Sequence, residues 1–253
     1  MLLAIDIGNS NIVAGVCGPG GIQNHWRINT GRERTADEYG LTLRGLLESA
    51  GAGKIDGAIV CSVVPALNEV FREAVEGCCG VRPLFVGDND VKVGIKIAVD
   101  NPSEVGADRI ANAVEAHGRF KSSVIVVDFG TATTFDYVTG EGEYAGGVIA
   151  PGIGISAEAL FLKTSMLPRV DIARPRGIIG KNTVEAMRSG LFWGFSGLVD
   201  GVIERMMAEA GTSPAIIATG GFAGAVSGGS RHIKEIDEFL TIKGLIKIYE
   251  GNS

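Results

Sequence analysis

The sequence of 253 residues has no excess of basic residues and no long apolar run. Its 23 lysines and arginines are outnumbered by 29 aspartates and glutamates, which gives a net charge of −6 at pH 7. Such a chain has no basic field that would attract nucleic acid or an anionic membrane surface. No run of about 18 apolar residues occurs, so we expect no transmembrane helix. Asp6 interrupts the apolar N-terminus and no basic segment precedes it, so we expect no signal peptide and a soluble, cytoplasmic protein.

Residues that commonly hold metal ions or form disulfides are also few. The four cysteines, Cys17, Cys61, Cys78 and Cys79, form no C-x-x-C motif. Two adjacent cysteines rarely close a disulfide with each other, so we expect reduced thiols. None of the three histidines lies in an H-E-x-x-H motif, so we expect no metal site built on histidine.

Glycine, by contrast, is abundant, with 38 residues in 253, which is about twice the usual share of roughly 7%. The glycines are spread between apolar segments, a pattern that indicates tight turns and close backbone approaches rather than disorder. Hydrophobic residues make up 45% of the chain, enough to build the core of one large domain or of two modest ones.

The first half of the chain predicts the element order βββαβαβα. Three short apolar segments joined by Gly- and Asn-containing turns predict an antiparallel meander. Apolar residues at helical spacing, after a Thr or Asp that can cap, predict the helix that follows. The expected elements are strands at Leu2–Ile7, Asn11–Cys17 and Ile22–Asn29, a helix at Thr35–Ala50, a strand at Gly57–Val64, a helix at Pro65–Glu76, a strand at Pro83–Val86 and a helix at Pro102–Phe120.

The second half repeats this order, which predicts an α/β protein of two similar βββαβαβα domains that face each other over a cleft. We place the boundary near Lys121, with domains at residues 1–121 and 122–253. The expected elements are strands at Ser123–Gly130, Thr131–Thr139 and Glu143–Ala150, helices at Ile153–Lys163 and Asn182–Ala210, a strand at Ala215–Gly221, and helices at Phe222–Val226 and Leu240–Tyr249.

Two turns with the pattern Asp-x-Gly lie at equivalent points of the two halves, after the first strand of each. They are "DIGNS", which begins at Asp6, and "DFGTAT", which begins at Asp128. Glycine lets an anion approach the backbone, main-chain N–H groups and Asn, Ser or Thr side chains donate to it, and the carboxylate holds the accompanying cation. One such turn is also compatible with an ordinary hairpin. Two at equivalent positions favour a phosphate site.

A third glycine-rich turn occurs in "AIIATGGFAG", at Ala215–Gly224. A strand runs here into Gly220-Gly221 and then into a helix. Such a turn lets a flat ring lie against the backbone, and the helix N-terminus favours a polyanion. After two phosphate turns, this third turn suits the adenosine part of a nucleotide.

Taken together, the three turns resemble the two phosphate motifs and the adenosine motif of the actin/hexokinase/Hsp70 ATPase superfamily. Within it, "NPSEVGADR" (Asn101–Arg109), "GGVIAPG" (Gly146–Gly152) and "GKNTVEAMRSG" (Gly180–Gly190) resemble type III pantothenate kinase, a bacterial enzyme of coenzyme A synthesis. The likeness runs from Leu3 to Tyr249. It implies a duplicated, ribonuclease H-like fold, ATP-dependent phosphorylation of pantothenate to 4′-phosphopantothenate, and a homodimer with its substrate pocket near the interface.

The resemblance also implies a role for each matched residue. Asp108, in the G-A-D-R stretch, would be the general base. Asp128 would hold a monovalent cation, potassium or ammonium, and Asp6 would hold the magnesium of ATP through water. The implied ATP contacts are Asp6, Ile7, Gly8, Asn9, Ser10, Asn11, Ile12, Val13 and Thr131, and the implied pantothenate contacts are Val99, Gly106, Ala107, Asp108, Arg109 and Thr183.

Val99 departs from the family pattern. The family often has a tyrosine at this position, just before "DNPSEVGADR", where it lines the pantothenate pocket. Valine supplies an apolar wall but no hydroxyl. If this chain differs from the family, we therefore expect the difference in the affinity or preference for the substrate and not in the phosphate chemistry.

Three other interpretations compete with the kinase. Asp108 and Arg109 also fit a surface charge pair at a helix start. "GIGISA" at Gly152–Ala157 fits the glycine spacing of a dinucleotide-binding Rossmann fold, although its strand would belong to a meander. The third is a nucleotide-binding regulator without catalysis, as the family name Bvg accessory factor implies. Such a protein would be expected to lose the base or the cation-binding aspartates, and all three are present.

Overall fold

The computed structural model describes residues 1–253, and its contacts divide the chain into two compact units. The first unit consists of Met1–Ile95, Asp100–Glu115 and Leu240–Ser253, and the second of Lys96–Val99 and Ala116–Phe239. The C-terminal segment therefore returns to the first unit. The division into domains at residues 121 and 122 stays a prediction.

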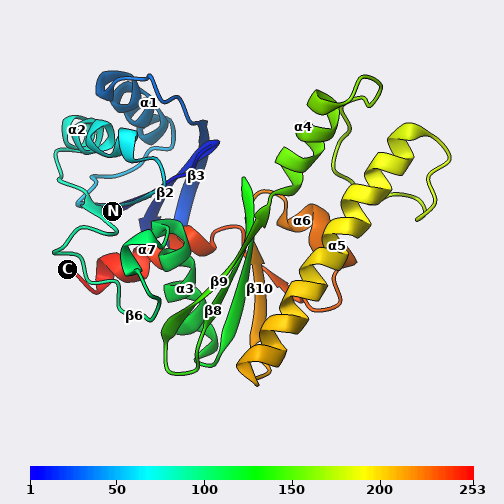
Figure 1. Ribbon diagram of the computed structural model, residues 1–253. Coiled ribbons are helices and arrows are strands. Elements are labelled where there is room, and N and C mark those ends of the chain that lie inside the picture. The colour runs from blue at the N-terminus through cyan, green and yellow to red at the C-terminus, as the bar shows by residue number, and fades with distance from the viewer. The chain divides into compact units, whose positions relative to one another are not determined.

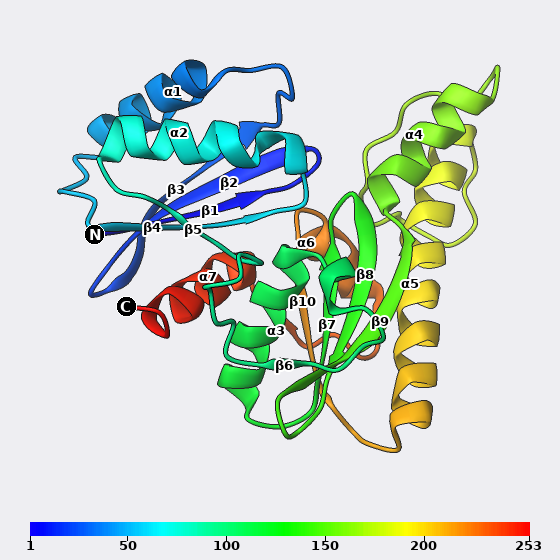
Figure 2. The ribbon, with the colours of Figure 1, turned by 60° about the vertical axis from the view of Figure 1, so that its left-hand side comes forward.

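The first unit is a five-stranded sheet with helices on both faces. Its strand order is β3-β2-β1-β4-β5, in which β1 pairs antiparallel with β2 and parallel with β4. Helices α1 and α2 pack side by side, and α7 contacts β1 and β4 (Figure 2). The elements are β1 (Leu2–Ile7), β2 (Asn11–Gly18), β3 (Gly21–Asn29), α1 (Ala36–Ser49), β4 (Gly57–Ser62), α2 (Asn68–Cys79), β5 (Leu84–Phe85), α3 (Ala107–Phe120, whose last residues from Ala116 belong to the second unit) and α7 (Leu240–Glu250), with 3-10 turns at Pro65–Leu67 and Pro102–Glu104.

Strand β1 is apolar almost throughout because both of its faces are covered. Leu3, Ile5 and Ile7 alternate into the core beneath α1 and α2, where the rings of Tyr39 and Phe71 lie 4.6 Å apart. Side chains that alternate with them point to the opposite face, which α7 covers. A strand buried on both faces reads as a continuous apolar run. An ionisable residue on such a strand must then be accommodated by specific partners.

Helix α7, which covers this opposite face, packs directly on α3. A Cβ on Gly244 would collide with the main chain of Ala111, so the two helices meet at a distance that only glycine allows. Thr241 donates to Asn112 Oδ1 over 2.8 Å, and Lys247 pairs with the buried Glu115 at 2.8 Å. These contacts hold α3 in place beside the sheet.

The second unit repeats the arrangement of the first and adds one strand. Its order is β11-β10-β7-β8-β9-β6, so the meander β7-β8-β9 and the parallel strands β10 and β11 reproduce the order of the first sheet (Figure 1). This confirms the predicted fold class. The elements are β6 (Lys96–Ile97), β7 (Val124–Phe129), β8 (Ala132–Val138), β9 (Glu143–Pro151), α4 (Ile153–Lys163), α5 (Thr183–Ala210), β10 (Ala215–Thr219), α6 (Ala223–Val226) and β11 (Glu235–Ile236), with a 3-10 turn at Ser227–Gly229.

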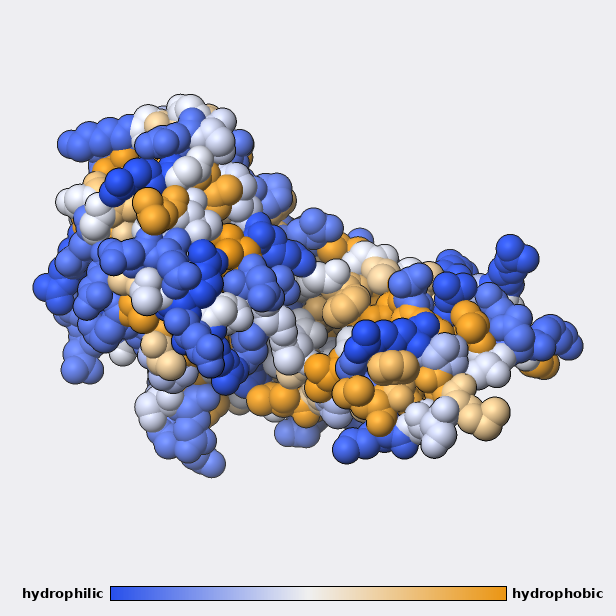
Figure 3. Space-filling model, turned by 90° about the horizontal axis from the view of Figure 1, so that it is seen from above, coloured by the Kyte–Doolittle hydropathy of each residue, from blue (hydrophilic) through white to orange (hydrophobic).

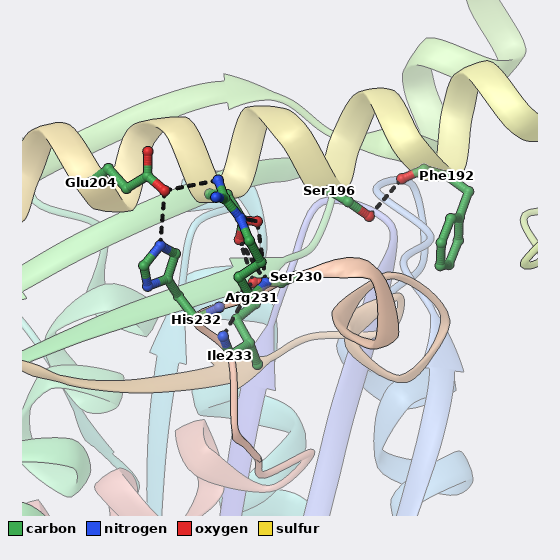
Figure 4. A network of polar contacts seen from close by, with 8 residues as sticks. Phe192, Ser196, Glu204, Ser230, Arg231, His232 and Ile233 are labelled. Atoms are coloured by element: carbon green, nitrogen blue, oxygen red, sulfur yellow. Dashed lines mark hydrogen bonds and ion pairs between the residues drawn. The ribbon is translucent and has the colours of Figure 1, made fainter. Parts of the chain in front are cut away.

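A network of polar contacts ties the segment before β11 to α5 (Figure 4). The carboxylate of Asp200, whose side chain is 6% exposed, accepts hydrogen bonds from Ser230 Oγ (2.6 Å) and from the main-chain N–H of Arg231 (3.1 Å) and its Nε (3.0 Å). Arg231 also pairs with Glu204 at 2.8 Å, and His232 Nε2 lies 3.1 Å from the same carboxylate. Burial alone would raise the pKa of Asp200, but the bonds from Ser230 and Arg231 outweigh it and hold the pKa below its ordinary value.

Asp200→Asn should therefore destabilise the protein in a pH-dependent way. A carboxyl group whose pKa is lowered by folding stabilises the folded state above its unfolded pKa, near 3.9, and this contribution disappears as the pH falls through the folded pKa. We expect a loss of about 1–3 kcal/mol in unfolding free energy at pH 7 and a smaller loss at pH 3, by urea denaturation. Asp171, which is 95% exposed, offers the control, and Asp171→Asn should stay within about 0.5 kcal/mol. A loss that is equal at the two pH values would contradict this prediction.

Candidate active site

The first Asp-x-Gly turn joins β1 to β2 in the first unit. The N–H of Gly8 donates to the carbonyl of Asn11 over 3.0 Å, and a Cβ on Gly8 would lie only 2.9 Å from that carbonyl. Glycine is therefore required for this turn. Asn9 and Ser10 are exposed at its tip, so their side chains and main-chain N–H groups are accessible to an anion.

Asp6 lies just before this turn, and its neighbour across the sheet is Cys61 of β4. The thiol of Cys61 donates to Asp6 Oδ1 over 3.3 Å. Burial raises the pKa of Asp6 to about 7, the nearby carboxylate of Asp108 adds to the rise, and the thiol hydrogen bond partly offsets it. Burial also raises the pKa of Cys61 well above its usual range, so the thiol keeps the proton that it donates. A cation beside the two carboxylates would stabilise the charged form of Asp6.

Asp108 is the second residue of α3, and its carboxylate folds back over the start of the helix. Its Oδ1 accepts a hydrogen bond from the N–H of Arg109 over 2.8 Å. The same oxygen lies 2.6 Å from the position that a Cβ on Gly106 would take. Glycine at position 106 thus makes room for the carboxylate. Asp108 is half-buried and close enough to Asp6 to raise its pKa, which distinguishes it from an exposed surface charge pair.

The loop after β3 covers the tip of the first turn. Thr30 donates to the carbonyl of Gly8 over 2.7 Å through its hydroxyl and to the carbonyl of Ser10 over 3.2 Å through its N–H. Arg32 Nη2 donates to Asn9 Oδ1 over 3.0 Å. Neither this loop nor Cys61 figures among the expected site residues, because no local motif marks them. Only the strand register brings them to the turn.

The second Asp-x-Gly turn, in the second unit, lies against the Gly220 turn. Gly220 has φ +91°, a conformation that favours glycine, and a Cβ there would collide with Asp128 Oδ1. The N–H of Phe222 donates to the carbonyl of Phe129 over 3.3 Å, which joins the two turns through the backbone. A Cβ on Gly152 would likewise collide with the carbonyl of Thr131. Three separate glycine-containing motifs thus meet around Asp128.

The remaining expected site residues of the second unit lie on different elements. Thr131 is exposed on the Asp128 turn. Val99 follows β6, and its Cγ1 lies 3.8 Å from the position that a Cβ on Gly146 of β9 would take. Thr183 is the exposed first residue of α5, which Asn182 caps by accepting from the N–H of Glu185 over 2.9 Å.

Two of the expected ATP contacts, Ile7 and Ile12, are fully buried in the core of the first unit. Neither residue has surface exposed to a ligand in this structure. The Rossmann interpretation of Gly152–Ala157 is wrong, because the strand before it, β9, pairs antiparallel with β8 and is no part of a βαβ unit.

The structure contains no group of three or more His, Cys, Asp or Glu side chains that could hold a metal ion. None of its helices is long and apolar enough to cross a membrane. A cation at Asp6 would thus take its other ligands from water or from a phosphate ligand, as magnesium usually does.

The fold is shared with solved structures of low sequence identity. The chain is similar over 99% of its length to 99% of a solved structure from Sinorhizobium meliloti that is described as a 2-dehydro-3-deoxygalactonokinase protein, with a TM-score of 0.63 and 13% identity. At this identity the likeness concerns the fold alone. It agrees with the two-sheet, actin-like fold class that the sequence predicts.

Sequence relatives define the family. The model of the type III pantothenate kinase family matches residues 2–205. Proteins named type III pantothenate kinase from Pelobacter propionicus and Geobacter sulfurreducens are 52% and 50% identical to this chain over 254 aligned residues, which cover 100% of this chain and 100% and 99% of theirs. The chain belongs to the type III pantothenate kinase family.

Gly220→Ala tests the packing of Asp128 against the Gly220 turn, with Gly211→Ala as its control. Both glycines have positive φ, but Gly211 has open space around it. Both variants should lose about 1–2 kcal/mol of unfolding free energy from the left-handed backbone. Only Gly220→Ala should also displace Asp128, and a displacement of about 1 Å in an active site can cost on the order of 10²-fold in rate. Equal kinase turnover in the two variants would contradict the inference that the Gly220 turn positions Asp128 for the reaction.

Proposed function

We propose that this protein transfers the γ-phosphoryl group of ATP to the primary hydroxyl of pantothenate and forms 4′-phosphopantothenate, in the first step of coenzyme A biosynthesis. One observation carries the proposal. The carboxylate of Asp108 lies in the G-A-D-R stretch at the start of α3, close to Asp6 of the first phosphate turn, in a chain of the type III pantothenate kinase family. This supports a proton acceptor near a turn that suits phosphate.

The reaction follows from these groups. The hydroxyl oxygen of pantothenate forms a bond to the γ-phosphorus while the bond from that phosphorus to the β,γ-bridging oxygen breaks, and ADP leaves with the electron pair. The hydroxyl proton passes to the carboxylate of Asp108. The hydrogen bond from the N–H of Arg109 orients this carboxylate. Gly106, which leaves room for it, has a structural part in the same step.

Asp6 is proposed to hold the magnesium of ATP through a water molecule. A half-buried carboxylate with a second carboxylate near it suits a divalent cation, since the two negative charges repel each other. Held there, magnesium would supply positive charge that offsets the negative charge of the phosphate groups during transfer. The tip of the turn, at Asn9 and Ser10, would donate to the same phosphates.

Asp128 is proposed to bind a monovalent cation, potassium or ammonium. The carboxylate lies against the Gly220 turn, and the carbonyl of Thr131 is close to Gly152, so oxygen atoms surround this turn. Pantothenate would contact Val99, Gly106, Ala107, Arg109 and Thr183 in addition to Asp108.

A homodimer is part of the proposal, and the surface of the second unit supports it. Figure 3 shows apolar side chains gathered where α4 and the first half of α5 lie. A groove of about 470 Å³ runs between these helices, and Leu162 of α4 and Met166, which follows α4, are exposed. A second copy of the chain would cover this apolar surface. The groove is lined by Leu160, Leu167, Met187, Leu191, Phe195 and Leu198.

A cytoplasmic location is also proposed, because the reaction consumes ATP.

The alternative of a regulator without catalysis is not favoured. Asp6, Asp108 and Asp128 are all retained, and relatives at about 50% identity over the full chain are named as kinases. The direct test is ADP release on addition of pantothenate to the protein with MgATP, followed by a coupled assay. The absence of pantothenate-dependent ADP release would refute the proposed function.

Asp108→Asn should abolish most of the turnover while ATP binding survives. The amide keeps the shape of the side chain but cannot take the proton, and general-base assistance typically contributes roughly 10²–10⁴-fold. Turnover is measured by ADP release and ATP binding by calorimetry. Asp37→Asn is the matched control, since Asp37 is the second residue of helix α1 as Asp108 is of α3. Turnover of Asp108→Asn within about twofold of the parent would show that Asp108 is not the base.

Potassium should activate the enzyme through Asp128. At equal ionic strength, turnover in potassium chloride should exceed that in sodium chloride by about tenfold, which corresponds to about 1.4 kcal/mol of transition-state stabilisation. Ammonium should replace potassium, and Asp128→Asn should remove the difference between the salts. Equal turnover of the parent protein in sodium and potassium would remove the cation site from the account.

A further inference from the structure

The first phosphate turn lacks a positive side chain of its own. None of the residues from Asp6 to Val13 is a lysine or an arginine, and the carboxylate of Asp108 lies near enough to Asp6 to raise the pKa of Asp6. A triphosphate that binds here must approach these carboxylates against their repulsion. Magnesium offsets part of this repulsion, and a nearby guanidinium would offset more, since arginine matches phosphate geometry with two parallel hydrogen bonds.

The loop after β3 places one arginine at the tip of this turn. Arg32 is exposed and its Nη2 lies 3.0 Å from Asn9 Oδ1. Thr30 joins the same loop to the turn by two bonds, from its hydroxyl to the carbonyl of Gly8 (2.7 Å) and from its N–H to the carbonyl of Ser10 (3.2 Å). Three hydrogen bonds therefore hold this loop against the turn.

Buried contacts fix the shape of this loop from behind. The hydroxyl of Tyr39, a fully buried residue, donates to the carbonyl of Gly31 and accepts from its N–H, both over 3.0 Å. The guanidinium of Arg34 lies over the ring of Tyr39, 4.5 Å from its centre, and donates to Thr42 over 2.8 Å. Arg34 thus serves the structure of the loop. Arg32, two residues earlier, points to the turn.

We propose that Arg32 is a phosphate-binding residue of the nucleotide site, whose guanidinium donates to the terminal phosphates of ATP at the first turn. A guanidinium carries five N–H donors, and the bond to Asn9 accounts for one of them in the structure. Asn9 holds the group beside the turn before the nucleotide arrives. The terminal phosphates are the partners, because the γ-phosphorus must reach the hydroxyl next to Asp108, which is close to Asp6. This inference rests on the proposed function, which supplies both the nucleotide and the place of its γ-phosphorus.

Nucleotides of different length provide the test. Binding of ATP, ADP and AMP, each with magnesium, is measured by calorimetry for the parent, Arg32→Gln and Arg32→Lys. Removing a hydrogen bond to a charged group at an exposed site should raise the Kd for ATP about tenfold in Arg32→Gln. The Kd for ADP should rise less, and that for AMP should stay within about twofold. Arg32→Lys keeps the charge without the fork, so its Kd for ATP should lie between those of the parent and Arg32→Gln.

Arg44→Gln is the matched control. Arg44 is an exposed arginine of the same unit whose guanidinium donates to the carbonyl of Gly77 over 3.1 Å. Arg44→Gln removes the same net charge as Arg32→Gln but lies away from the turn, so its Kd for ATP should stay within about twofold of that of the parent. The melting temperature of each variant shows whether the fold is kept.

Two results would overturn the role of Arg32. One is a Kd for ATP in Arg32→Gln within twofold of the parent, and the other is an equal loss for ATP and AMP, which would place the contact away from the terminal phosphates. These measurements need no pantothenate. A parent protein that binds ATP but releases no ADP with pantothenate would refute the proposed kinase activity and leave the role of Arg32 standing.

Discussion

The first unit must accommodate two carboxylates near each other, those of Asp6 and Asp108, where the buried strand β1 ends. Asp6 lies on β1, whose two faces are covered, and Asp108 lies close enough to raise its pKa. Like charges in a poorly solvated place are costly unless donors and cations offset them. Cys61 supplies one donor, and the N–H of Arg109 supplies another to Asp108. Magnesium would stabilise the charged form of both carboxylates further.

Glycine contacts recur wherever this arrangement needs space. Gly106 leaves room for the carboxylate of Asp108, and Gly244 lets α7 pack on α3, the helix that carries it. In the second unit, Gly220 leaves room for Asp128 in the same way. The unusual share of glycine is thus explained at these positions by close approach of backbone or carboxylate. The two units share a strand order, but Asp6 meets a cysteine side chain and Asp128 meets a backbone turn.

Local pattern was sufficient where a segment is decided by its own residues. The apolar run Leu2–Ile7 and the segment Ile153–Lys163 have the predicted bounds as β1 and α4. The repeat of the strand order also followed from the sequence, because two similar series of segments were present. The helix expected from Pro102 begins only at Ala107, after a separate 3-10 turn at Pro102–Glu104.

Features set by tertiary pairing were beyond the reach of the sequence. Strands β6 and β11 have two residues each and exist only through their neighbours. The return of α7 to the first unit depends on the contact at Gly244. Cys61 and Arg32 reach the first turn from 55 and 23 residues away, and no motif connects them to it. Asp6 and Asp128 were predicted as site residues because each begins a short Asp-x-Gly turn, whereas Asp108 was predicted from the resemblance of its G-A-D-R stretch to the family.

The most direct test of the account follows the phosphoryl group itself. Enzyme in excess over ATP labelled with ³²P at the γ-position is mixed with pantothenate and quenched at intervals within the first turnover. The account predicts that the label passes from ATP to phosphopantothenate at the rate at which ADP appears, with no label on the protein, because Asp108 acts as a base and not as a nucleophile. Label that accumulates on the protein, or that appears as inorganic phosphate without phosphopantothenate, would contradict it.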